Sequence, residues 1–289
     1  MPFRPRGMPQ NPHGLPLLAR GTPFVYTRNA LQNSSRLWSR LVKSRYASPL
    51  ARRNWDHNGR NGIPRGKHPN DRCITLDALA SERPDVYYLP MIVTIANGKG
   101  GACKTTTAIH LAAYLQQLAP TLLLDADGTR NAINWVARGG QMGVPFRVAP
   151  AEHAAKLVGA YKHIVIDTGQ RPTGEDLRAA AEGCDLLVVP SVPTPIDTDG
   201  LAQTVLALQG IGAANYKVLL ARVAPEAAKD ALELRHLLAE MGAPVFRSQI
   251  PRLKAFERAS GLGTTVDQVS DPNAGRGWAA YEKVGEEVL

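Results

Sequence analysis

The residue types best suited to chemistry gather in one glycine-rich run, residues 97–107, which reads NGKGGACKTTT. The run follows a β-branched segment and precedes an Ala- and Leu-rich one, so we predict a strand, a tight turn and a helix. Glycines in such a turn let successive backbone N–H groups point at a phosphate, and the helix N-terminus adds partial positive charge. Lys104 would then reach the β- and γ-phosphates of a nucleotide, while Thr105 binds Mg²⁺. A turn that binds nothing is the alternative, against which the two lysines and three threonines argue.

Cys103 is the one departure from the phosphate-loop pattern GxxxxGK[ST], which has glycine directly before the lysine. A side chain at this position restricts the backbone and must point away from the phosphates. Cys103 could instead be a redox or nucleophilic residue, but no histidine stands near it in the sequence. We therefore assign Cys103 a role in the backbone of the loop.

Two further apolar runs end in carboxylates. Residues 122–127 read LLLDAD, and residues 163–169 read HIVIDTG. Carboxylates at strand ends suit phosphoryl transfer, in which positioning and charge neutralisation supply most of the rate. On residue pattern alone, Asp125 and Asp127 are equally compatible with a solvated turn, and a strand that ends in an aspartate such as Asp167 is common.

The elements that must position these residues alternate along residues 91–289, where short β-branched runs are followed by longer Ala/Leu-rich amphipathic segments. This alternation predicts one α/β domain with a mostly parallel twisted sheet, and the fully apolar strands require helices on both faces. The predicted strands are 92–96, 121–125, 144–148, 163–167, 186–190, 218–223 and 245–250. The predicted helices are 104–118, 151–161, 175–183, 199–210, 226–241 and 278–288.

Residues 1–90 have a different composition, with scattered Pro and Gly and no acidic residue before Asp56. They carry 15 Lys and Arg against 5 Asp and Glu, whereas residues 91–289 carry 19 against 20. We predict a basic N-terminal segment with little stable structure. Three interpretations stay open: translated upstream sequence without a function, favoured by Met91 directly before the first strand; a basic arm that binds nucleic acid; or an Arg-rich targeting segment.

The three cysteines, Cys73, Cys103 and Cys184, are widely separated and lack the spacing of metal sites. This excludes a disulfide framework and disfavours zinc and iron–sulfur centres. No apolar run approaches the roughly 20 residues of a membrane-spanning helix, so we expect a soluble, cytoplasmic protein. The last predicted helix carries three glutamates against one lysine and should pack on the domain rather than bind an anionic membrane.

The loop segment 99–106, KGGACKTT, resembles the deviant Walker A motif KGGxGKTT of the ParA/MinD family of ATPases. The resemblance extends over essentially all of residues 91–289 and implies a P-loop NTPase fold similar to that of small plasmid-partition ParA (ParF-like) proteins. It implies ATP and Mg²⁺ as ligands, and a homodimer in which Lys99 crosses to the phosphates of the partner subunit. The loop residues that it places on the nucleotide are Gly98, Lys99, Gly100, Gly101, Ala102, Cys103, Lys104, Thr105 and Thr106.

By the same resemblance, LLLDAD matches the family's hhhDxD segment. Asp127 would orient or activate the attacking water, and Asp125 would support Mg²⁺ or the switch loop. The catalytic set that this implies is Lys99, Lys104 and Asp127. The family usually continues with Pro-Gln, whereas this chain has Gly128-Thr129, which leaves the hydrolysis rate and the geometry of the switch loop open.

The segment HIVIDTG looks like the family's Walker B strand, which would place Asp167 just outside the ligands of Mg²⁺ and leave Thr105 as a direct ligand. Residues 250–252, IPR, resemble a late segment of the family whose loop lies against the adenine. Pro251 and Arg222 are therefore predicted on the base side of the nucleotide. The alternative for both is a surface loop position without a ligand.

The densest basic group of residues 91–289 lies in its last third and consists of Arg247, Arg252, Lys254 and Arg258. On a loop that leads into a helix, these side chains could face DNA phosphates and give sequence-independent, salt-sensitive binding. A solvated charged surface is the competing interpretation. The family resemblance favours DNA.

As a whole, the resemblance implies a nucleoid-associated DNA-partition ATPase without a membrane partner. Its ATP-bound homodimer would bind nonspecific double-stranded DNA, and a small centromere-binding ParB/ParG-type protein would stimulate the hydrolysis that resets the switch. A metabolic P-loop ATP-dependent ligase of the same superfamily is the second hypothesis, and it would need a further substrate pocket. The third hypothesis is a nucleotide-binding module that no longer hydrolyses ATP, prompted by Cys103 and Gly128-Thr129.

Overall fold

The computed structural model describes residues 89–140, 143–169, 172 and 174–289. The expectation of a basic segment with little structure over residues 1–90 therefore lies outside the described residues, apart from the last two of that segment. In the described part, the predicted α/β fold is confirmed. The strands are β1 (Met91–Ile95), β2 (Thr121–Ala126), β3 (Arg147–Pro150), β4 (His163–Thr168), β5 (Leu186–Ser191) and β6 (Tyr216–Leu220).

These strands form one parallel sheet with the order β3-β2-β4-β1-β5-β6. β1 lies between β4 and β5, and Ile95 near its end is in register with Asp167 of β4 and Val188 of β5. Because the strands are parallel, their carboxyl ends meet at one edge of the sheet. The loops after β1, β2 and β4 converge at this edge, so the fold brings the glycine-rich run and both carboxylate segments together.

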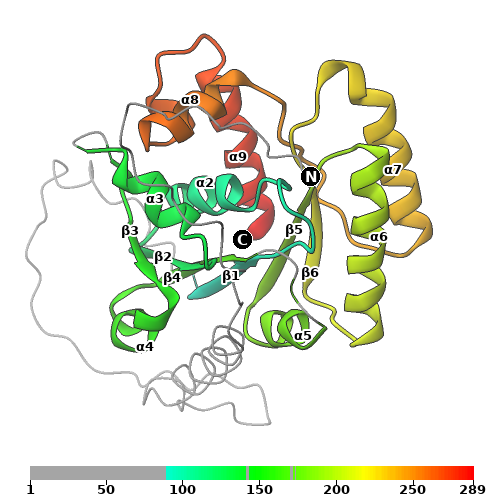
Figure 1. The fold of residues 1–289 in the computed structure, drawn as a ribbon, viewed down its shortest axis with the longest axis horizontal. Coiled ribbons are helices and arrows are strands. Elements are labelled where there is room, and N and C mark those ends of the chain that lie inside the picture. The colour runs from blue at the N-terminus through cyan, green and yellow to red at the C-terminus, as the bar shows by residue number, and fades with distance from the viewer. Residues whose placement is uncertain (1–88, 141–142, 170–171, 173) are drawn as a thin grey trace, which may run out of the picture.

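Helices cover both faces of the sheet, as the apolar strands require (Figure 1). The α-helices are α2 (Lys104–Gln116), α3 (Asn131–Ala137), α4 (Ala154–Leu157), α5 (Gly174–Glu182), α6 (Pro195–Gly210), α7 (Ala228–Glu240), α8 (Lys254–Leu262) and α9 (Ala274–Val288). Short 3₁₀ turns are η3 (Ala151–His153), η4 (Val158–Ala160), η5 (Pro225–Ala227) and η6 (Val266–Gln268).

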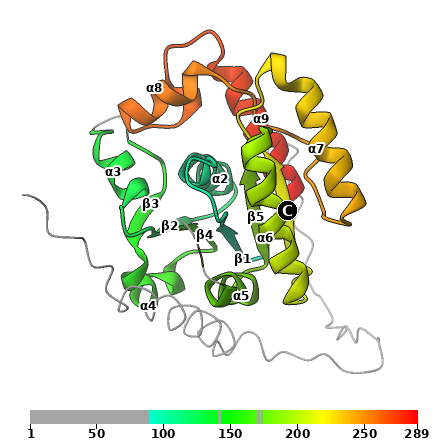
Figure 2. The same cartoon turned by 45° about the vertical axis from the view of Figure 1, so that its right-hand side comes forward.

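Two apolar cores lie on the two faces of the sheet. Helices α2, α3, α8 and α9 pack on the face that presents Val93 and Leu123. Helices α4, α5, α6 and α7 pack on the opposite face, which presents Ile92 and Leu124. Figure 2 shows α2 and α5 on opposite sides of the strands. Successive strand residues therefore point into different cores, which explains why these strands have no polar face.

The last helix, α9, packs on the domain, as its composition predicts. Tyr281, Val284 and Val288 are buried in the core beneath α2 and α8. Among the described residues, none of the helices combines the length and the apolar character that crossing a membrane demands.

Some predicted elements differ from the structure. The sequence predicts no helix over residues 131–137, because α3 has only two turns and therefore shows little periodicity. The predicted helix 151–161 is broken into η3, α4 and η4, and the predicted strand 144–148 begins later, at Arg147.

The predicted strand 245–250 is replaced by a segment that has isolated bridges to the β6 region at Val245 and Pro251 and donates from the backbone N–H groups of Phe246 and Ile250 to β6 (both 2.9 Å). Glu287 of α9 explains the interruption. Its carboxylate accepts the backbone N–H groups of Arg247 (2.9 Å) and Ser248 (2.8 Å). Phe246 N–H donates to β6, and alternate N–H groups of a strand point to the same side, so Ser248 N–H would be the next donor to β6. Glu287 takes this donor, so no continuous strand forms.

Candidate functional site

The loop between β1 and α2 has the backbone of a phosphate cradle. Gly101 (φ 78°) and Cys103 (φ 63°) are both left-handed, so the chain curls from β1 into the first turn of α2. Lys104 opens the helix, and its Nζ donates to the carbonyl oxygen of Lys99 (3.0 Å) in the same loop. Cys103 occupies the position that is glycine in the phosphate-loop pattern, and its left-handed backbone is strained because cysteine has a Cβ.

Burial raises the pKa of the Cys103 thiol to about 11. The thiol is therefore protonated at neutral pH, whereas the reactive form of a cysteine is the thiolate. The thiol makes a long polar contact from Sγ to the carbonyl oxygen of Gly101 (3.9 Å). These properties support a role in the loop backbone over a nucleophilic one.

Thr105 and Asp167 meet at the carboxyl edge of the sheet, where the predicted metal site lies. Thr105 Oγ1 donates to Asp167 Oδ2 (2.7 Å), while Asp167 Oδ1 is buried and has no hydrogen-bond partner among the residues that the structure describes. Burial raises the pKa of Asp167 to about 7, although the bond from Thr105 opposes this shift. A buried oxygen without a partner indicates a missing polar neighbour.

These residues fit Mg²⁺ held mainly by phosphate and water oxygens, with the Thr105 hydroxyl as the protein ligand. Asp167 has one oxygen left for a water of the ion. No cluster of three or more His, Cys, Asp or Glu side chains that could hold a metal occurs in the part of the chain that the structure describes. The site is therefore suited to a metal that arrives with a nucleotide.

Asp125 is engaged by the backbone of the loop that follows it. Its Oδ1 accepts the N–H of Asp127 (3.0 Å), and its Oδ2 accepts the N–H of Ile133 (3.0 Å). Burial raises the pKa of Asp125, and these two bonds oppose the shift. Both carboxylate oxygens of Asp125 therefore bond to the backbone of the segment that follows β2, and its predicted support of Mg²⁺ or of the switch loop stays a prediction.

Asp127 lies at the start of this loop and is paired with a residue that sequence reasoning missed. Its Oδ1 accepts the backbone N–H of Thr129 (3.0 Å), and its Oδ2 accepts the Nδ2 group of Asn131 (3.1 Å). Both Asp127 and Asn131 line the same cleft. An amide at a helix start, four residues after the aspartate, was the signal that could have identified Asn131. The pair is suited to orienting a water beside a terminal phosphate.

That cleft has a volume of about 520 Å³. Residues 101–106 line it, together with residues of the chain after β6 and of helix α8, including Arg222, Phe256 and Ser260. Its size suits a nucleotide with the phosphates on the loop and the nucleoside toward α8. Arg222, which is predicted to contact the base of the nucleotide, also lines the cleft. Four predicted contacts do not line it, namely Gly98, Lys99, Gly100 and Pro251.

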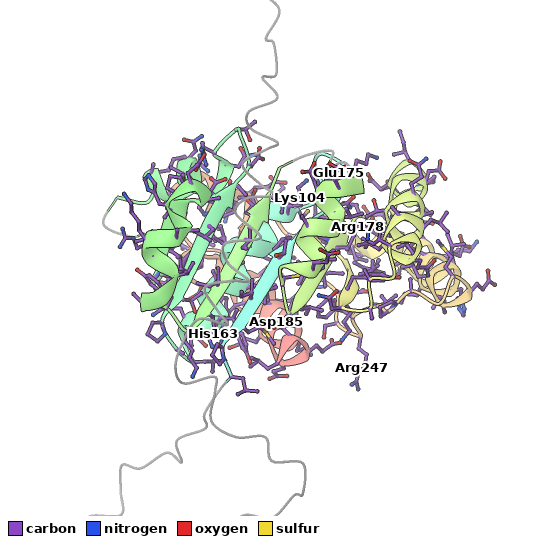
Figure 3. All side chains as sticks on the ribbon, turned by 90° about the horizontal axis from the view of Figure 1, so that it is seen from below. Lys104, His163, Glu175, Arg178, Asp185 and Arg247 are labelled. Carbon is purple, nitrogen blue, oxygen red and sulfur yellow. The ribbon has the colours of Figure 1, made fainter. Side chains whose placement is uncertain are left out.

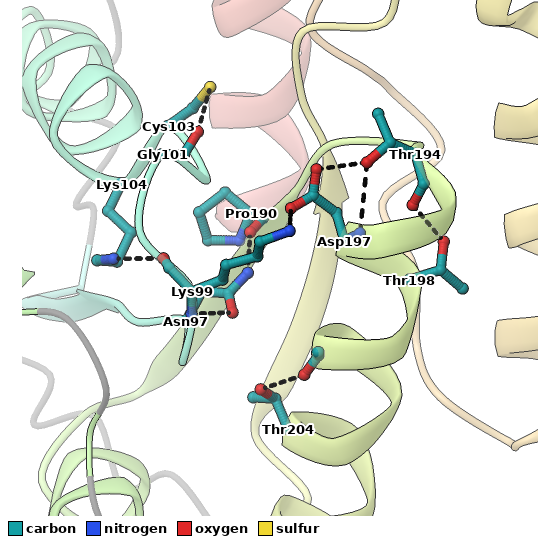
Figure 4. Close-up of polar contacts among 11 residues, drawn as sticks. Asn97, Lys99, Gly101, Cys103, Lys104, Pro190, Thr194, Asp197, Thr198 and Thr204 are labelled. Atoms are coloured by element: carbon teal, nitrogen blue, oxygen red, sulfur yellow. Dashed lines mark hydrogen bonds and ion pairs between the residues drawn. The ribbon is translucent and has the colours of Figure 1, made fainter.

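Lys99 and Lys104 point in different directions (Figure 4), and only Lys104 lines the cleft. Its ammonium forms an ion pair with Asp197 in the first turn of α6, and Thr194 caps that turn by accepting the N–H of Asp197 (3.3 Å). The side chain of Lys99 stays 33% exposed and borders a second cleft of about 510 Å³. The two lysines of the loop therefore have different directions. Asp197 was missed because it is remote from the loop in sequence.

The four predicted DNA-contacting residues do not form one surface. Figure 3 shows Arg247 at the opposite end of the sheet from Lys104. Arg258 pairs with Asp271 (2.6 Å), so part of its charge is compensated. Arg252 is exposed at the rim of the nucleotide cleft, and Lys254 is exposed at the start of α8. A contact of these residues with DNA stays a prediction.

Residues 93–266 match the family profile described as the CobQ/CobB/MinD/ParA nucleotide binding domain. This range runs from β1 to the start of η6. It therefore contains the phosphate loop, both carboxylate segments and α8, and every residue that lines the cleft except Tyr281.

Two known proteins are similar to this chain over most of their length. The maintenance of carboxysome distribution protein A of Gloeobacter kilaueensis is 36% identical over 204 residues, which cover 69% of this chain and 94% of that protein. The chromosome-partitioning ATPase Soj of Thermus thermophilus is 28% identical over 243 residues, which cover 68% of this chain and 94% of Soj.

A solved structure has the same fold. It is that of a putative plasmid partition protein from Borrelia burgdorferi bound to AMPPNP, with a TM-score of 0.53 and 18% identity. The match covers 69% of this chain and 98% of the other. At this identity, the likeness concerns the fold alone.

Proposed function

The chain belongs to the CobQ/CobB/MinD/ParA nucleotide-binding domain family, and from this premise we propose that it is an ATP-operated dimerisation switch that moves a cargo over nonspecific DNA. ParA/MinD proteins are P-loop ATPases, and this chain has the phosphate loop and carboxylates of that class. In the proposed cycle, ATP and Mg²⁺ close a homodimer that binds DNA, and hydrolysis opens it again.

The different directions of Lys104 and Lys99 carry this proposal. Lys104 lines the nucleotide cleft of its own chain, whereas Lys99 borders the neighbouring cleft and is held there by Asp197. Lys99 does not line the cleft of its own chain, and its side chain is partly exposed. It is therefore available to the phosphates of a second copy. This is the role that the family resemblance implies for Lys99.

Phosphoryl transfer requires groups that hold the phosphates, neutralise their charge and position the attacking water. One chain has residues suited to each of these roles. The backbone of residues 101–106 and Lys104 would hold the phosphates, and bound Mg²⁺ would neutralise the charge that develops on them. Burial lowers the pKa of Lys104, but the carboxylates of Asp167 and Asp127 oppose this shift and favour the ammonium form. Asn131 would hold Asp127 toward the attacking water.

Nonspecific DNA binding is supported by charge at two places. Arg252 and Lys254 are exposed beside the nucleotide cleft, and a dimer would double their number. Residues 1–90 add 15 Lys and Arg against 5 Asp and Glu. Contacts of this type bind through the phosphate backbone and weaken steeply with salt.

The names of the two relatives suggest two kinds of cargo. Soj is named for chromosome partitioning, and the Gloeobacter protein is named for carboxysome distribution. Our first candidate is DNA segregation with a small centromere-binding ParB/ParG-type partner that stimulates hydrolysis. The second candidate is the distribution of a carboxysome-like cargo, which the higher identity of the Gloeobacter relative favours.

A metabolic ATP-dependent ligase is the competing function, since the second cleft adjoins the phosphate loop. Lys99, Arg222 and Arg252 border this cleft and could bind a carboxylate acceptor. Such an enzyme would release ADP only when an acceptor is present, and it would be indifferent to DNA.

Steady-state ATP hydrolysis by the full chain, with and without nonspecific duplex DNA, tests the proposed function. We expect weak activity that DNA raises and that added salt suppresses. In DNA-binding titrations at several salt concentrations, log DNA affinity should fall with log salt less steeply for Lys254→Ala than for the wild type. The slope should differ by about 1 per protomer. Lys229→Ala, which removes an exposed lysine of α7, is the matched control. Hydrolysis that ignores DNA and requires an added carboxylic acid would contradict the switch and support the ligase.

A further inference from the structure

Helix α3 starts at the loop that carries Asp127 and ends beside α8, a helix that lines the nucleotide cleft. Its start is fixed to the end of β2, because Ile133 N–H donates to Asp125 and Asn131 Nδ2 donates to Asp127. With seven residues, α3 is roughly 10 Å long and leaves little room for bending between its ends. A movement of one end is therefore transmitted to the other.

The other end of α3 is bonded to α8 and to the residues just after it. Arg138, the C-cap of α3, donates from Nε to the carbonyl oxygen of Ser260 (2.8 Å). Trp135 Nε1 donates to the carbonyl oxygen of Thr264 (3.0 Å), and this bond is buried. Two donors from one helix thus fix its distance to the second helix.

Close backbone packing reinforces these bonds. Gly263 ends α8 in a left-handed conformation (φ 69°), and a Cβ on it would overlap the backbone of Gly139 and of Trp135. The ring of His110 on α2 lies edge-on to Trp135 (6.2 Å between centroids) and to Phe256 (5.3 Å). Three helices therefore pack together at this point, namely α2, α3 and α8.

We propose that Arg138 is a positioning residue that couples the nucleoside end of the cleft to Asp127, so that the base and ribose accelerate hydrolysis and do not merely add affinity. Ser260, which accepts the bond from Arg138, lines the cleft. A nucleoside against α8 fixes α8, the Arg138 bond fixes α3, and α3 fixes Asn131 and Asp127. Binding energy from a remote part of the substrate is thereby used to position the reacting groups. The inference rests on the proposed function only in placing ATP in this cleft.

Hydrogen exchange of the full chain with Mg²⁺ and either AMPPNP or inorganic tripolyphosphate tests this coupling without turnover. Tripolyphosphate can occupy the phosphate loop but lacks the base and ribose. We expect AMPPNP to slow exchange in α8 and in residues 127–134, and tripolyphosphate to slow it only in the phosphate loop. In Arg138→Ala, AMPPNP should still protect α8 but should protect residues 127–134 less than in the wild type, because the Trp135 bond remains.

Two further variants separate coupling from folding. Arg138→Lys keeps a donor and should restore part of the protection, whereas Arg178→Ala removes an exposed arginine of α5 and should behave as the wild type. Equal protection of residues 127–134 in the wild type and in Arg138→Ala would overturn the proposal.

Hydrolysis rates give the second test. Arg138→Ala should lower kcat for ATP about tenfold and keep KM for ATP within about twofold of the wild-type value. Its rate of tripolyphosphate hydrolysis should equal that of the wild type. An equal loss with both substrates would mean a purely structural role and would also overturn the coupling. If the wild type hydrolyses neither substrate, the proposed function fails, and the exchange experiment still decides whether Arg138 couples the two ends.

Discussion

Lys99 and Asp197 form an ion pair that bridges the phosphate loop and the first turn of α6. Asp197 is itself fixed, because Thr194 accepts its N–H and donates its hydroxyl to Asp197 Oδ2 (2.5 Å). The pair therefore holds Lys99 on its own chain. If Lys99 serves a second copy, as we propose, this contact breaks when the ATP-bound dimer forms.

Asp197→Asn should strengthen ATP-dependent dimerisation, because Lys99 no longer has to leave a carboxylate. A partly exposed ion pair contributes about 0.2–1 kcal/mol, which corresponds to roughly 1.5- to 5-fold in the association constant for each protomer. Analytical ultracentrifugation with ATP and Mg²⁺ measures the change, with Asp199→Asn in the same helix as the control. A dimer that is unchanged or weaker would show that Asp197 does not restrain Lys99.

Asn131→Ala should lower kcat for ATP about tenfold with little change in nucleotide affinity, because Asp127 loses the amide that orients it. Asn134→Ala is the matched control. It removes a bond from the same helix to the carbonyl oxygen of Thr129 (3.2 Å) but does not touch Asp127. Single-turnover hydrolysis and nucleotide titration separate the two effects. Equal rates in the two variants would exclude a role for Asn131 in positioning Asp127.

Cys103→Gly should be tolerated and Cys103→Val should not, because the residue at this position is left-handed (φ 63°). A left-handed conformation costs a residue with a Cβ roughly 1–2 kcal/mol, and glycine avoids this cost. We expect ATP affinity to be kept or improved in the glycine variant and reduced about tenfold in the valine variant. Isothermal titration with ATP and Mg²⁺ checks this order, and a valine variant that binds as tightly as the glycine variant contradicts it.

His110 should make the folded protein less stable at acidic pH. Its Nδ1 bonds with the carbonyl oxygen of Thr106 (2.7 Å) and its Nε2 accepts the N–H of Val266 (3.0 Å), which requires a neutral ring with the proton on Nδ1. Burial lowers the pKa of His110 from 6.5 to about 4. The unfolded chain therefore takes up a proton below about pH 6.5, while the folded chain does so only near pH 4.

The free energy of unfolding should consequently fall as the pH drops from about 6.5 to about 4 and level off below, by roughly 3 kcal/mol for this group. Urea denaturation at several pH values across this window measures the slope. His110→Gln should flatten it. Identical slopes in the wild type and the variant would assign the pH dependence to other groups.

The sheet could be predicted from the sequence because its strands are local features. Runs such as residues 186–191 are apolar on both faces, and burial between two helical layers requires nothing more specific. The site could be predicted where it follows strand ends, since Asp125 and Asp167 are register partners in adjacent strands. Parallel topology then brings them to the phosphate loop without further information.

The remaining features depend on contacts between distant segments. Glu287 takes two backbone donors from residues 245–250, and no pattern within that segment reveals this loss. Asp197 reaches Lys99 only because α6 starts beside the phosphate loop. Helix α3 is too short to show a period, so Asn131 and Arg138 could not be assigned to it.

The most direct test of the proposed switch is the mass of the full chain in solution, measured by light scattering with ATP and Mg²⁺ and again with ADP. We predict that the wild type doubles its mass with ATP and returns to a monomer with ADP. Lys99→Ala should stay monomeric while it still binds ATP through Lys104. A wild type that binds ATP as a monomer, or a Lys99→Ala variant that dimerises as well as the wild type, would contradict the account.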